Sequence, residues 1–353
     1  MAIILSGILF FSGCSMAPSL KKNDASGGFK FSESIWKSTD GGVTWEAKNQ
    51  GEGIAGAKDV DILSLAINPK NSNNVFAGLR SGGILKTENG GETWTFMNFQ
   101  SEKVYGLALD PSDGQTLYAS GVWQGRGKIF KSNDRGGNWE EIYTGPADGP
   151  LVISLTIDKN NPDIVYATTS ANEALKSLDG GLSWKNIYLS SAPILGISTD
   201  ASDGNLIYFI TNRETVFRSA DGGANFENIT DRINKSLAGA GMGGRKFDFL
   251  KTDPAQSGHV YLAGEGGIAL SRDRGETWEK IPVLNDPKKF PVMALAVDPR
   301  DSGNLAYGAT QAVYKSSDGG NNWITFQFQT ERKINVLEYD PADPDVVYLG
   351  FTK

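Results

Sequence analysis

The chain has 353 residues, a formal net charge of −7 at pH 7 and a pI near 5.0, with one histidine, His259, and one cysteine, Cys14. The acidic balance argues against nucleic-acid binding, which needs a clustered positive surface. The lone His and Cys argue against metal, thiol and His-dependent triad sites, which need several such residues. We therefore expect no metal, no cofactor and no nucleic-acid partner.

The amino terminus is typical of an export signal. Residues 2 to 11 form an apolar run that is too short for a membrane span of about 20 residues but suits a signal-peptide core. The run ends at Phe11-Ser12-Gly13-Cys14, which resembles a bacterial lipobox and implies lipidation of Cys14. An ordinary secretory signal is the alternative, because Phe11 replaces the usual Leu and no Lys or Arg precedes the run. Residues 1 to 14 thus predict an exported protein, anchored as a lipoprotein at the bacterial cell envelope or extracellular surface.

Residues 15 to 28 are mainly Ser, Lys, Asn, Gly and Pro, and this composition buries little apolar surface. We expect a flexible tether there. The tether would join the membrane anchor to one domain over residues 29 to 353.

One eight-residue pattern, Ser/Thr-x-Asp/Asn-x-Gly-x-x-Trp/Phe, occurs seven times in that domain at intervals of 42 to 52 residues. A period near this length is typical of stacked four-stranded units. Glycine supplies the positive φ of a tight turn, the Asp or Asn side chain bonds the turn's backbone, and the aromatic side chain is buried against a neighbouring unit. We assign a structural role to the seven acidic or amide residues of the boxes, which are Asp40, Asn89, Asp134, Asp179, Asp221, Asp273 and Asp318.

A second phrase also occurs seven times: an apolar segment ending in Asp or Asn, a polar turn and a Val-Tyr-Ala-like strand. With the box hairpin it makes four strands per unit, so we predict an all-β protein, a seven-bladed β-propeller. The domain begins with a lone box hairpin at residues 34 to 47 and ends with a lone strand pair at 334 to 351. We expect the last blade to be closed by two strands from each terminus, which removes exposed sheet edges.

The box resembles the Asp-box, or BNR repeat, of sialidases, xyloglucanases, sortilin-type receptors and photosystem II assembly factors. In that family it is a structural turn of a propeller blade, so the resemblance implies a fold and says little about activity. The Arg-Ile-Pro segment of sialidases, the second propeller of xyloglucanases and the Cys-rich appendage of sortilin-type receptors are not found here. Photosystem II assembly factors carry a functional arginine cluster, and some are lipoproteins.

The face opposite the boxes, made of second-to-third-strand loops and blade-to-blade connections, is where we expect a binding site. Trp123 is the tryptophan that the repeat does not explain, and beside Arg126 it would suit stacking on a sugar or anchoring a partner protein. The alternative is a Trp123 folded onto its own blade. Arginines on this face would suit an acidic ligand. The candidate ligand-binding residues are Arg80, Trp123, Arg126, Arg213, Glu214, Arg245, Glu265 and Arg332.

Two further expectations concern the central channel of the predicted propeller. The connection of residues 230 to 246 is long and Gly-rich, and we expect it to fold over the channel mouth. Lys251 and Glu338 break the pattern of small residues on the inner strands, so we expect them to project toward the channel.

Two functions stay open. The first is a monomeric, exported propeller that binds a protein or carbohydrate partner as an assembly or adhesion scaffold. The second is a glycoside hydrolase of the xyloglucanase or sialidase-like type, which needs two carboxyl groups about 5 to 10 Å apart across a cleft. Glu173, Glu214 and Glu265 are the candidates for that pair, and no catalytic residue is assigned.

Overall fold

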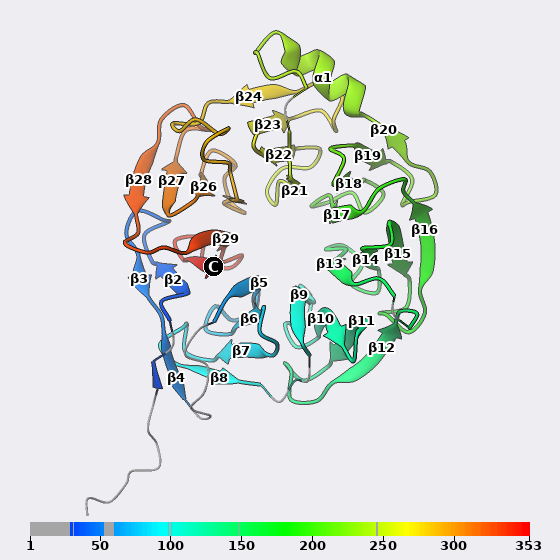
Figure 1. Cartoon of the computed structure of the whole chain (residues 1–353), viewed down its shortest axis with the longest axis vertical. Helices are drawn as coiled ribbons and strands as arrows, with labels where there is room; N and C mark the ends of the chain where they lie inside the picture. Colours follow the sequence, from blue (N-terminus) through cyan, green and yellow to red (C-terminus); the bar gives the residue numbers. More distant parts are fainter. Residues whose placement is uncertain are drawn as a thin grey trace, which may run out of the picture.

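The computed structural model describes residues 29–30, 32–52, 60–97, 99, 101–147, 149–244 and 246–353. In these residues seven β-sheets stand in a ring around a common central axis, as Figure 1 shows. The all-β, seven-bladed propeller predicted from the repeat is confirmed. The predicted signal peptide and tether of residues 1 to 28, with Cys14, lie outside the described residues, as does Arg245.

Each blade has four antiparallel strands, and we name a blade by its innermost strand. The innermost strands are β5 (Ile62–Ile67), β9 (Lys103–Leu109), β13 (Val152–Ile157), β17 (Ile194–Thr199), β21 (Phe249–Thr252), β25 (Ala294–Val297) and β29 (Lys333–Tyr339). The second strands are β6 (Val75–Leu79), β10 (Leu117–Trp123), β14 (Val165–Thr169), β18 (Ile207–Thr211), β22 (Val260–Gly264), β26 (Leu305–Ala309) and β30 (Val347–Thr352).

The two outer strands of each blade form the box hairpin. The third strands are β7 (Ile84–Thr87), β11 (Arg126–Ser132), β15 (Glu173–Ser177), β19 (Val216–Ser219), β23 (Gly267–Ser271), β27 (Ala312–Ser316) and β2 (Ile35–Ser38). The outermost strands are β8 (Trp94–Phe96), β12 (Glu140–Thr144), β16 (Lys185–Leu189), β20 (Glu227–Asn228), β24 (Glu279–Ile281), β28 (Ile324–Gln327) and β3 (Glu46–Ala47). In the β5 blade, β4 (Gln50–Glu52) pairs in parallel with β8, and β1 (Phe29–Lys30) pairs with β4.

The β29 blade is built from both ends of the domain. Its strand order is β29-β30-β2-β3, and β2 pairs with β30 from Ile35 opposite Gly350 to Ser38 opposite Val347. The predicted closure, two strands from each terminus, is therefore confirmed. This pairing gives the first and last parts of the ring a shared sheet.

The boxes are turns held by their own side chains. In the β9 blade, Oδ1 of Asp134 accepts hydrogen bonds from the backbone N–H of Asn138 and from the Ser132 hydroxyl, at 2.8 Å each. These bonds lower the pKa of Asp134 to about 2. Since the carboxylate serves the turn in this way, the geometry agrees with the structural role assigned from the sequence. The same bonding occurs at Asp40, Asn89, Asp179, Asp221, Asp273 and Asp318.

Neighbouring boxes are tied to one another around part of the ring. The ammonium group of Lys131, on β11, donates to the carbonyl oxygen of Gly180 in the next box at 3.0 Å. Lys37 and Lys176 make the same contact with Gly90 and Gly222, at 2.9 and 2.7 Å. The box is thus an inter-blade joint as well as a hairpin turn.

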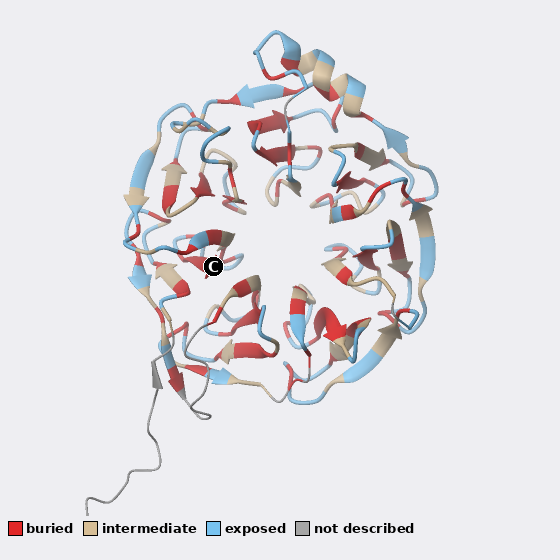
Figure 2. Cartoon of the chain, viewed as in Figure 1, coloured by how far each residue is buried: buried red, intermediate tan, exposed pale blue. Residues whose placement is uncertain are grey.

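Burial falls from the middle strands to the rim (Figure 2). The second strands are buried at every residue except Trp123, because both of their faces pack on adjacent blades. The closing aromatics differ: Trp94 is completely buried, whereas Trp139 and Trp184 are only half-buried. The prediction that the aromatic of each box is buried against its neighbour therefore holds fully for some blades and partly for others.

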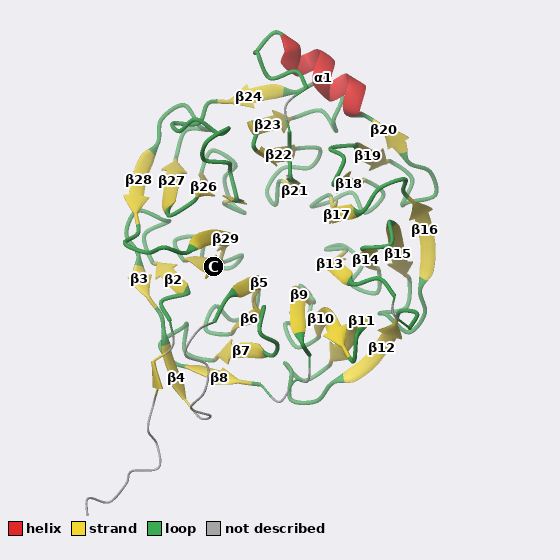
Figure 3. Cartoon of the chain, viewed as in Figure 1, coloured by secondary structure: helices red, strands yellow, loops and turns green. Residues whose placement is uncertain are grey.

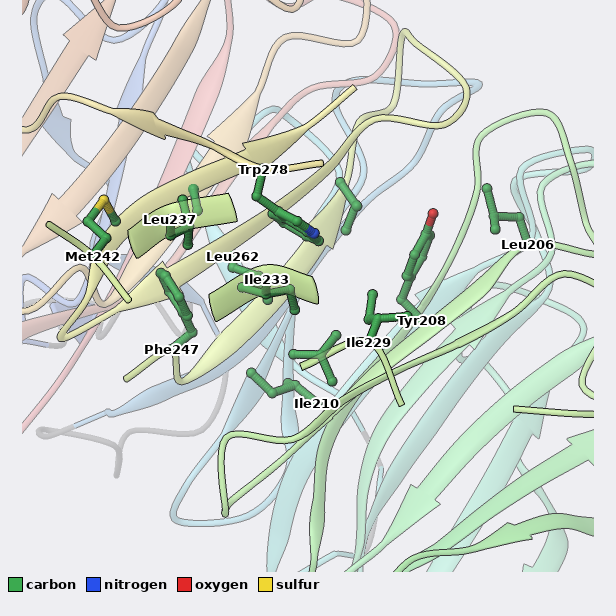
Figure 4. Close-up of a cluster of buried hydrophobic side chains, with 13 residues drawn as sticks. Leu206, Tyr208, Ile210, Ile229, Ile233, Leu237, Met242, Phe247, Leu262 and Trp278 are labelled. Carbon is green, nitrogen blue, oxygen red and sulfur yellow. The ribbon is translucent and has the colours of Figure 1, made fainter. Parts of the chain in front are cut away.

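The connection between β20 and β21 does not fold over the channel mouth, which corrects the expectation for residues 230 to 246. It forms α1 (Thr230–Ala238) at the outer rim of the ring (Figure 3). Ile233 and Leu237, one helical turn apart, are buried against Leu262 and Trp278 (Figure 4). This apolar stripe covers the β21 blade from outside. No helix in the described part of the chain has the length and apolarity to cross a membrane.

Candidate functional site

Trp123 is the last residue of strand β10 in a long hairpin, so it belongs to a strand and not to the second-to-third-strand loop in which the sequence analysis placed it. Strands β10 and β11 are joined by a two-residue turn, Gln124 and Gly125, with φ of 53° and 69°. Both residues take the positive φ that a type I′ turn requires. Trp123 pairs with Arg126 across the hairpin, and its side chain is half-buried.

The register of the hairpin sets which side chains share a face. Alternate residues of a strand point to the same side, so Arg126 and Phe130 share one face of β11. Trp123 is opposite Arg126, and Glu141 on β12 is opposite Phe130. Trp123, Phe130 and Glu141 therefore lie along one face of the β9 blade, over roughly 13 Å of strand.

These side chains line a surface pocket, which we call the Trp123 pocket. It has a volume of ≈ 350 Å³ and is lined by Phe99, Trp123, Phe130, Gly137, Asn138, Trp139 and Glu141. Phe99 comes from the connection between β8 and β9, and its ring centroid is 5.1 Å from Phe130 and 4.6 Å from Trp139. The pocket therefore brings four aromatic side chains together with the polar side chains of Asn138 and Glu141.

Glu141 is the carboxylate of the pocket. Its Oε2 accepts a hydrogen bond from the ammonium of Lys128 at 2.5 Å, and its Oε1 accepts one from the Thr144 hydroxyl. Partial burial alone would raise the pKa of Glu141, but the bonds from Lys128 and Thr144 lower it below its ordinary value. Glu141 is therefore an anionic hydrogen-bond acceptor near neutral pH.

Two of the predicted binding arginines, Arg126 and Arg332, are engaged by groups of the protein itself. Arg126 donates from Nε and Nη2 to the carbonyl oxygen of Gly145, at 2.8 and 2.5 Å. Arg332 is 9% exposed, and its Nη1 lies 2.6 Å from Oδ1 of Asp61 and 3.0 Å from the carbonyl oxygen of Val60. Arg332, a predicted ligand-binding residue, thus contacts groups at the junction of the β29 and β5 blades.

Arg80 lies at the same junction. Its Nε is 3.5 Å from Oδ2 of Asp61, and its Nη2 donates to the Thr352 hydroxyl at 2.9 Å. Arg213 is exposed on the turn after β18. The structure therefore brings Arg80 and Arg332 together around Asp61, whereas Trp123 and Arg126 are paired on another blade.

The three glutamates proposed for a hydrolase come from different blades and do not line the Trp123 pocket. Glu173 accepts hydrogen bonds from the Thr169 hydroxyl at 2.9 Å and from the Asn186 amide at 3.3 Å. Glu214 is 3.8 Å from the ammonium of Lys246, and Glu265 is exposed. Among the described residues no group of three or more His, Cys, Asp or Glu side chains is placed to hold a metal ion.

The pocket residues that were not predicted from the sequence are Phe99, Phe130, Trp139 and Glu141. Trp139 was explained by its box, and Phe99 belongs to an irregular connection whose position no repeat indicates. One signal was present: the hairpin of β10 and β11 has seven-residue strands where the other blades have four to six. The alternation of Arg126, Lys128 and Phe130 along it predicts a shared face with Trp123.

Three comparisons relate the chain to known proteins. The family model of the BNR-Asp box repeat matches residues 129–142. The xyloglucanase Xgh74A of Acetivibrio thermocellus is 26% identical over 204 residues, which are 46% of this chain and 23% of that protein. The chain thus spans less than a quarter of the length of that curated relative.

Two solved structures share the fold. The GH74 enzyme of Niastella koreensis has a TM-score of 0.64 at 19% identity, over 82% of this chain and 51% of that chain. A structure of YCF48 bound to a D1 peptide has a TM-score of 0.62 at 13% identity, over 83% of this chain and 94% of that chain. At these identities the likeness shows the propeller fold alone.

Proposed function

We propose that this seven-bladed Asp-box β-propeller is a glycan-binding scaffold, and that the Trp123 pocket holds a neutral oligosaccharide. The observation that carries the proposal is the placement of four aromatic side chains around one pocket together with the polar side chains of Asn138 and Glu141; the aromatic residues are Phe99, Trp123, Phe130 and Trp139. Aromatic rings with a few fixed polar groups are the common composition of small-ligand sites.

The shape of the pocket suits a chain of sugar rings. Trp123 and Phe130 are separated by roughly 13 Å along the strands, so a ligand that contacts both is elongated. The apolar faces of sugar rings pack on large aromatic side chains, which lose little conformational entropy on binding. The Glu141 carboxylate can accept hydrogen bonds from sugar hydroxyl groups, and the Asn138 side-chain amide can accept hydrogen bonds from them or donate to them.

The electrostatics favour binding over hydrolysis. A glycosidase general acid needs a raised pKa so that it is protonated at working pH. The pKa of Glu141 is instead lowered, because Lys128 and Thr144 hold its carboxylate in the charged form. Such a group can orient a sugar hydroxyl but is a poor proton donor to a leaving group.

A neutral ligand is also favoured over an acidic one. Arg80, Arg126 and Arg332 are engaged by groups of the protein itself, so an acidic peptide would have to displace those bonds. The similarity to a xyloglucanase makes xyloglucan oligosaccharides the first probe to test. We further propose that lipidation at Cys14 anchors the propeller at the cell envelope, where it would act in adhesion or assembly.

Affinity electrophoresis in gels containing xyloglucan tests the proposal. We expect the wild-type protein to be retarded, Trp123→Ala to migrate freely, and Trp184→Ala, a half-buried tryptophan outside the pocket, to be retarded like wild type. If no neutral polysaccharide in the gel retards the wild-type protein, glycan binding is contradicted. Release of reducing ends by wild type but not by Glu141→Gln would contradict a pure binding role and establish a hydrolase.

A further inference from the structure

The end of the channel nearest the Asp-boxes contains a second pocket, which we call the axial pocket. It has a volume of ≈ 300 Å³ and is lined by residues of the β5, β13, β17, β21, β25 and β29 blades. Its charged lining residues are Lys159, Lys251 and Glu338. The expectation that Lys251 and Glu338 project into the channel is thereby confirmed.

Lys251 and Glu338 form an ion pair within the pocket. The ammonium of Lys251, on β21, lies 2.7 Å from Oε2 of Glu338, on β29. Lys159 enters from the turn that follows β13. Among the described residues no hydrogen bond or ion pair engages the Lys159 ammonium. The pocket therefore holds two ammonium groups and one carboxylate, so one positive charge is not neutralised.

The neighbouring aspartates do not neutralise this charge directly. Asp200 and Asp253 lie beneath adjacent turns, are completely buried and do not line the pocket. Asp200 accepts the backbone N–H of Gly258 at 2.7 Å, and Asp253 accepts that of Ala255 at 2.8 Å. Lys159 itself is exposed to solvent at the channel end, yet the surrounding blades desolvate its ammonium. This desolvation and the nearby Lys251 lower the pKa of Lys159.

Hydroxyl groups complete the wall between the lysines. Oγ of Ser198 is 2.8 Å from Oγ1 of Thr252, and the Thr252 hydroxyl donates to the carbonyl oxygen of Thr199 at 2.8 Å. Hydroxyls beside ammonium groups can bond both the carboxylate and the hydroxyl groups of a ligand. The lining of the axial pocket also includes apolar side chains, among them Leu65, Ile157 and Val297.

We infer that the axial pocket binds a small hydroxylated monocarboxylate, with the ammonium groups of Lys159 and Lys251 as its charge partners. A monocarboxylate carries one negative charge, which would neutralise the one uncompensated positive charge of the pocket. A phosphate dianion would instead be repelled by the Glu338 carboxylate. A bound carboxylate would share Lys251 with Glu338 and give Lys159 the partner that the protein does not supply. This site uses no residue of the Trp123 pocket and goes beyond the proposed glycan binding.

Isothermal titration with D-glucuronate, and with D-glucose and inorganic phosphate as comparison ligands, tests the inference in the full chain. We expect wild type to bind glucuronate and Trp123→Ala to bind it with the same affinity. Failure of the axial-pocket inference can therefore be distinguished from failure of the glycan proposal at the Trp123 pocket. Lys159→Gln should weaken glucuronate binding about tenfold or more. The control Lys235→Gln, on exposed α1, should leave it unchanged.

Glu338→Gln gives the sharper outcome. It frees Lys251 from its competing carboxylate, so we expect glucuronate to bind several-fold more tightly, with a melting temperature measured alongside to verify folding. The inference would be overturned if wild type did not bind glucuronate, or if wild type, Lys159→Gln and Glu338→Gln bound it with equal affinity. Tighter binding of phosphate than of glucuronate would also overturn it.

Discussion

The Nη1 atom of Arg332 lies 2.6 Å from Oδ1 of Asp61, although the two residues are 271 positions apart in the sequence. Asp61 also accepts the backbone N–H of Lys353 at 2.9 Å and lies 3.5 Å from Nε of Arg80. It therefore joins the β29 blade to the β5 blade at the point where the ring closes. Side chains of Asp61 and Arg332 are only 15% and 11% exposed, so water replaces their interaction poorly.

Asp61→Ala should destabilise the protein by about 3 kcal/mol, because it removes the Asp61 carboxylate from the largely buried Arg332 guanidinium. The free energy of unfolding from urea titration measures this effect. Asp231→Ala, which removes an exposed carboxylate from α1, is the control and should change stability by less than about 0.5 kcal/mol. Equal stability of both variants would show that the Asp61 contacts do not hold the closure.

Trp94→Ala should cost about 3 to 5 kcal/mol, because this closing aromatic is completely buried and its removal leaves a cavity. Trp184 closes an equivalent box but is half-buried, so Trp184→Ala should cost clearly less. Chemical denaturation of both variants gives the comparison. A larger loss for Trp184→Ala would mean that burial in the ring does not determine what a box aromatic contributes.

Acid should weaken the boxes within a narrow pH range. Hydrogen bonds from Ser183 and Asn225 lower the pKa values of Asp179 and Asp221 from 3.8 to about 2. A carboxyl group whose folded pKa is lowered stabilises the protein above its unfolded pKa, and this stability is lost as the pH falls through the folded value. The melting temperature should therefore drop between about pH 4 and pH 2.

Replacing Asp179 and Asp221 together by Asn, the residue that Asn89 already provides in another box, should make that drop shallower. Melting temperatures of wild type and the double variant from pH 6 to pH 2 give the slopes. The double variant Asp231→Asn/Asp301→Asn, which removes two exposed carboxylates elsewhere, controls for net charge. Identical slopes for wild type and the box variant would argue against the boxes as the acid-sensitive elements.

Cys14→Ser should release the protein from the membrane fraction, because the apolar run before Cys14 is too short to span a bilayer and lipidation would be lost. Fractionation of cells that express wild type and variant, followed by immunoblotting, measures the distribution. A variant that still sediments with membranes after a high-salt wash would show that the lipobox interpretation is wrong.

The fold could be predicted because the residues that determine each hairpin lie close together in the sequence. Each box contains its own turn residues, so Asp134 or Gly136 indicates a hairpin without knowledge of any other blade. The regular period of the boxes indicates one box for each blade, so the seven boxes indicate seven blades. The closure was also readable, since the two incomplete units are complementary.

The site could not be predicted to the same degree because it depends on packing between distant segments. Phe99 reaches Trp139 only because a blade-to-blade connection places it there, and no sequence period marks that contact. Asp61, the partner of Arg332, lies 271 residues away in the sequence. The sequence alone therefore does not distinguish a buried, paired Arg332 from an exposed arginine that binds a ligand. The helix α1 was missed because glycines obscured the apolar pair Ile233 and Leu237.

The most direct test of glycan binding is isothermal titration of a xyloglucan oligosaccharide into wild type, Trp123→Ala, Arg213→Ala and the control Trp184→Ala, at low and high salt. We predict that Trp123→Ala weakens binding at least about tenfold, or 1.4 kcal/mol, while the other two variants and added salt have little effect. Affinity that is unchanged in Trp123→Ala would contradict a glycan site at the Trp123 pocket.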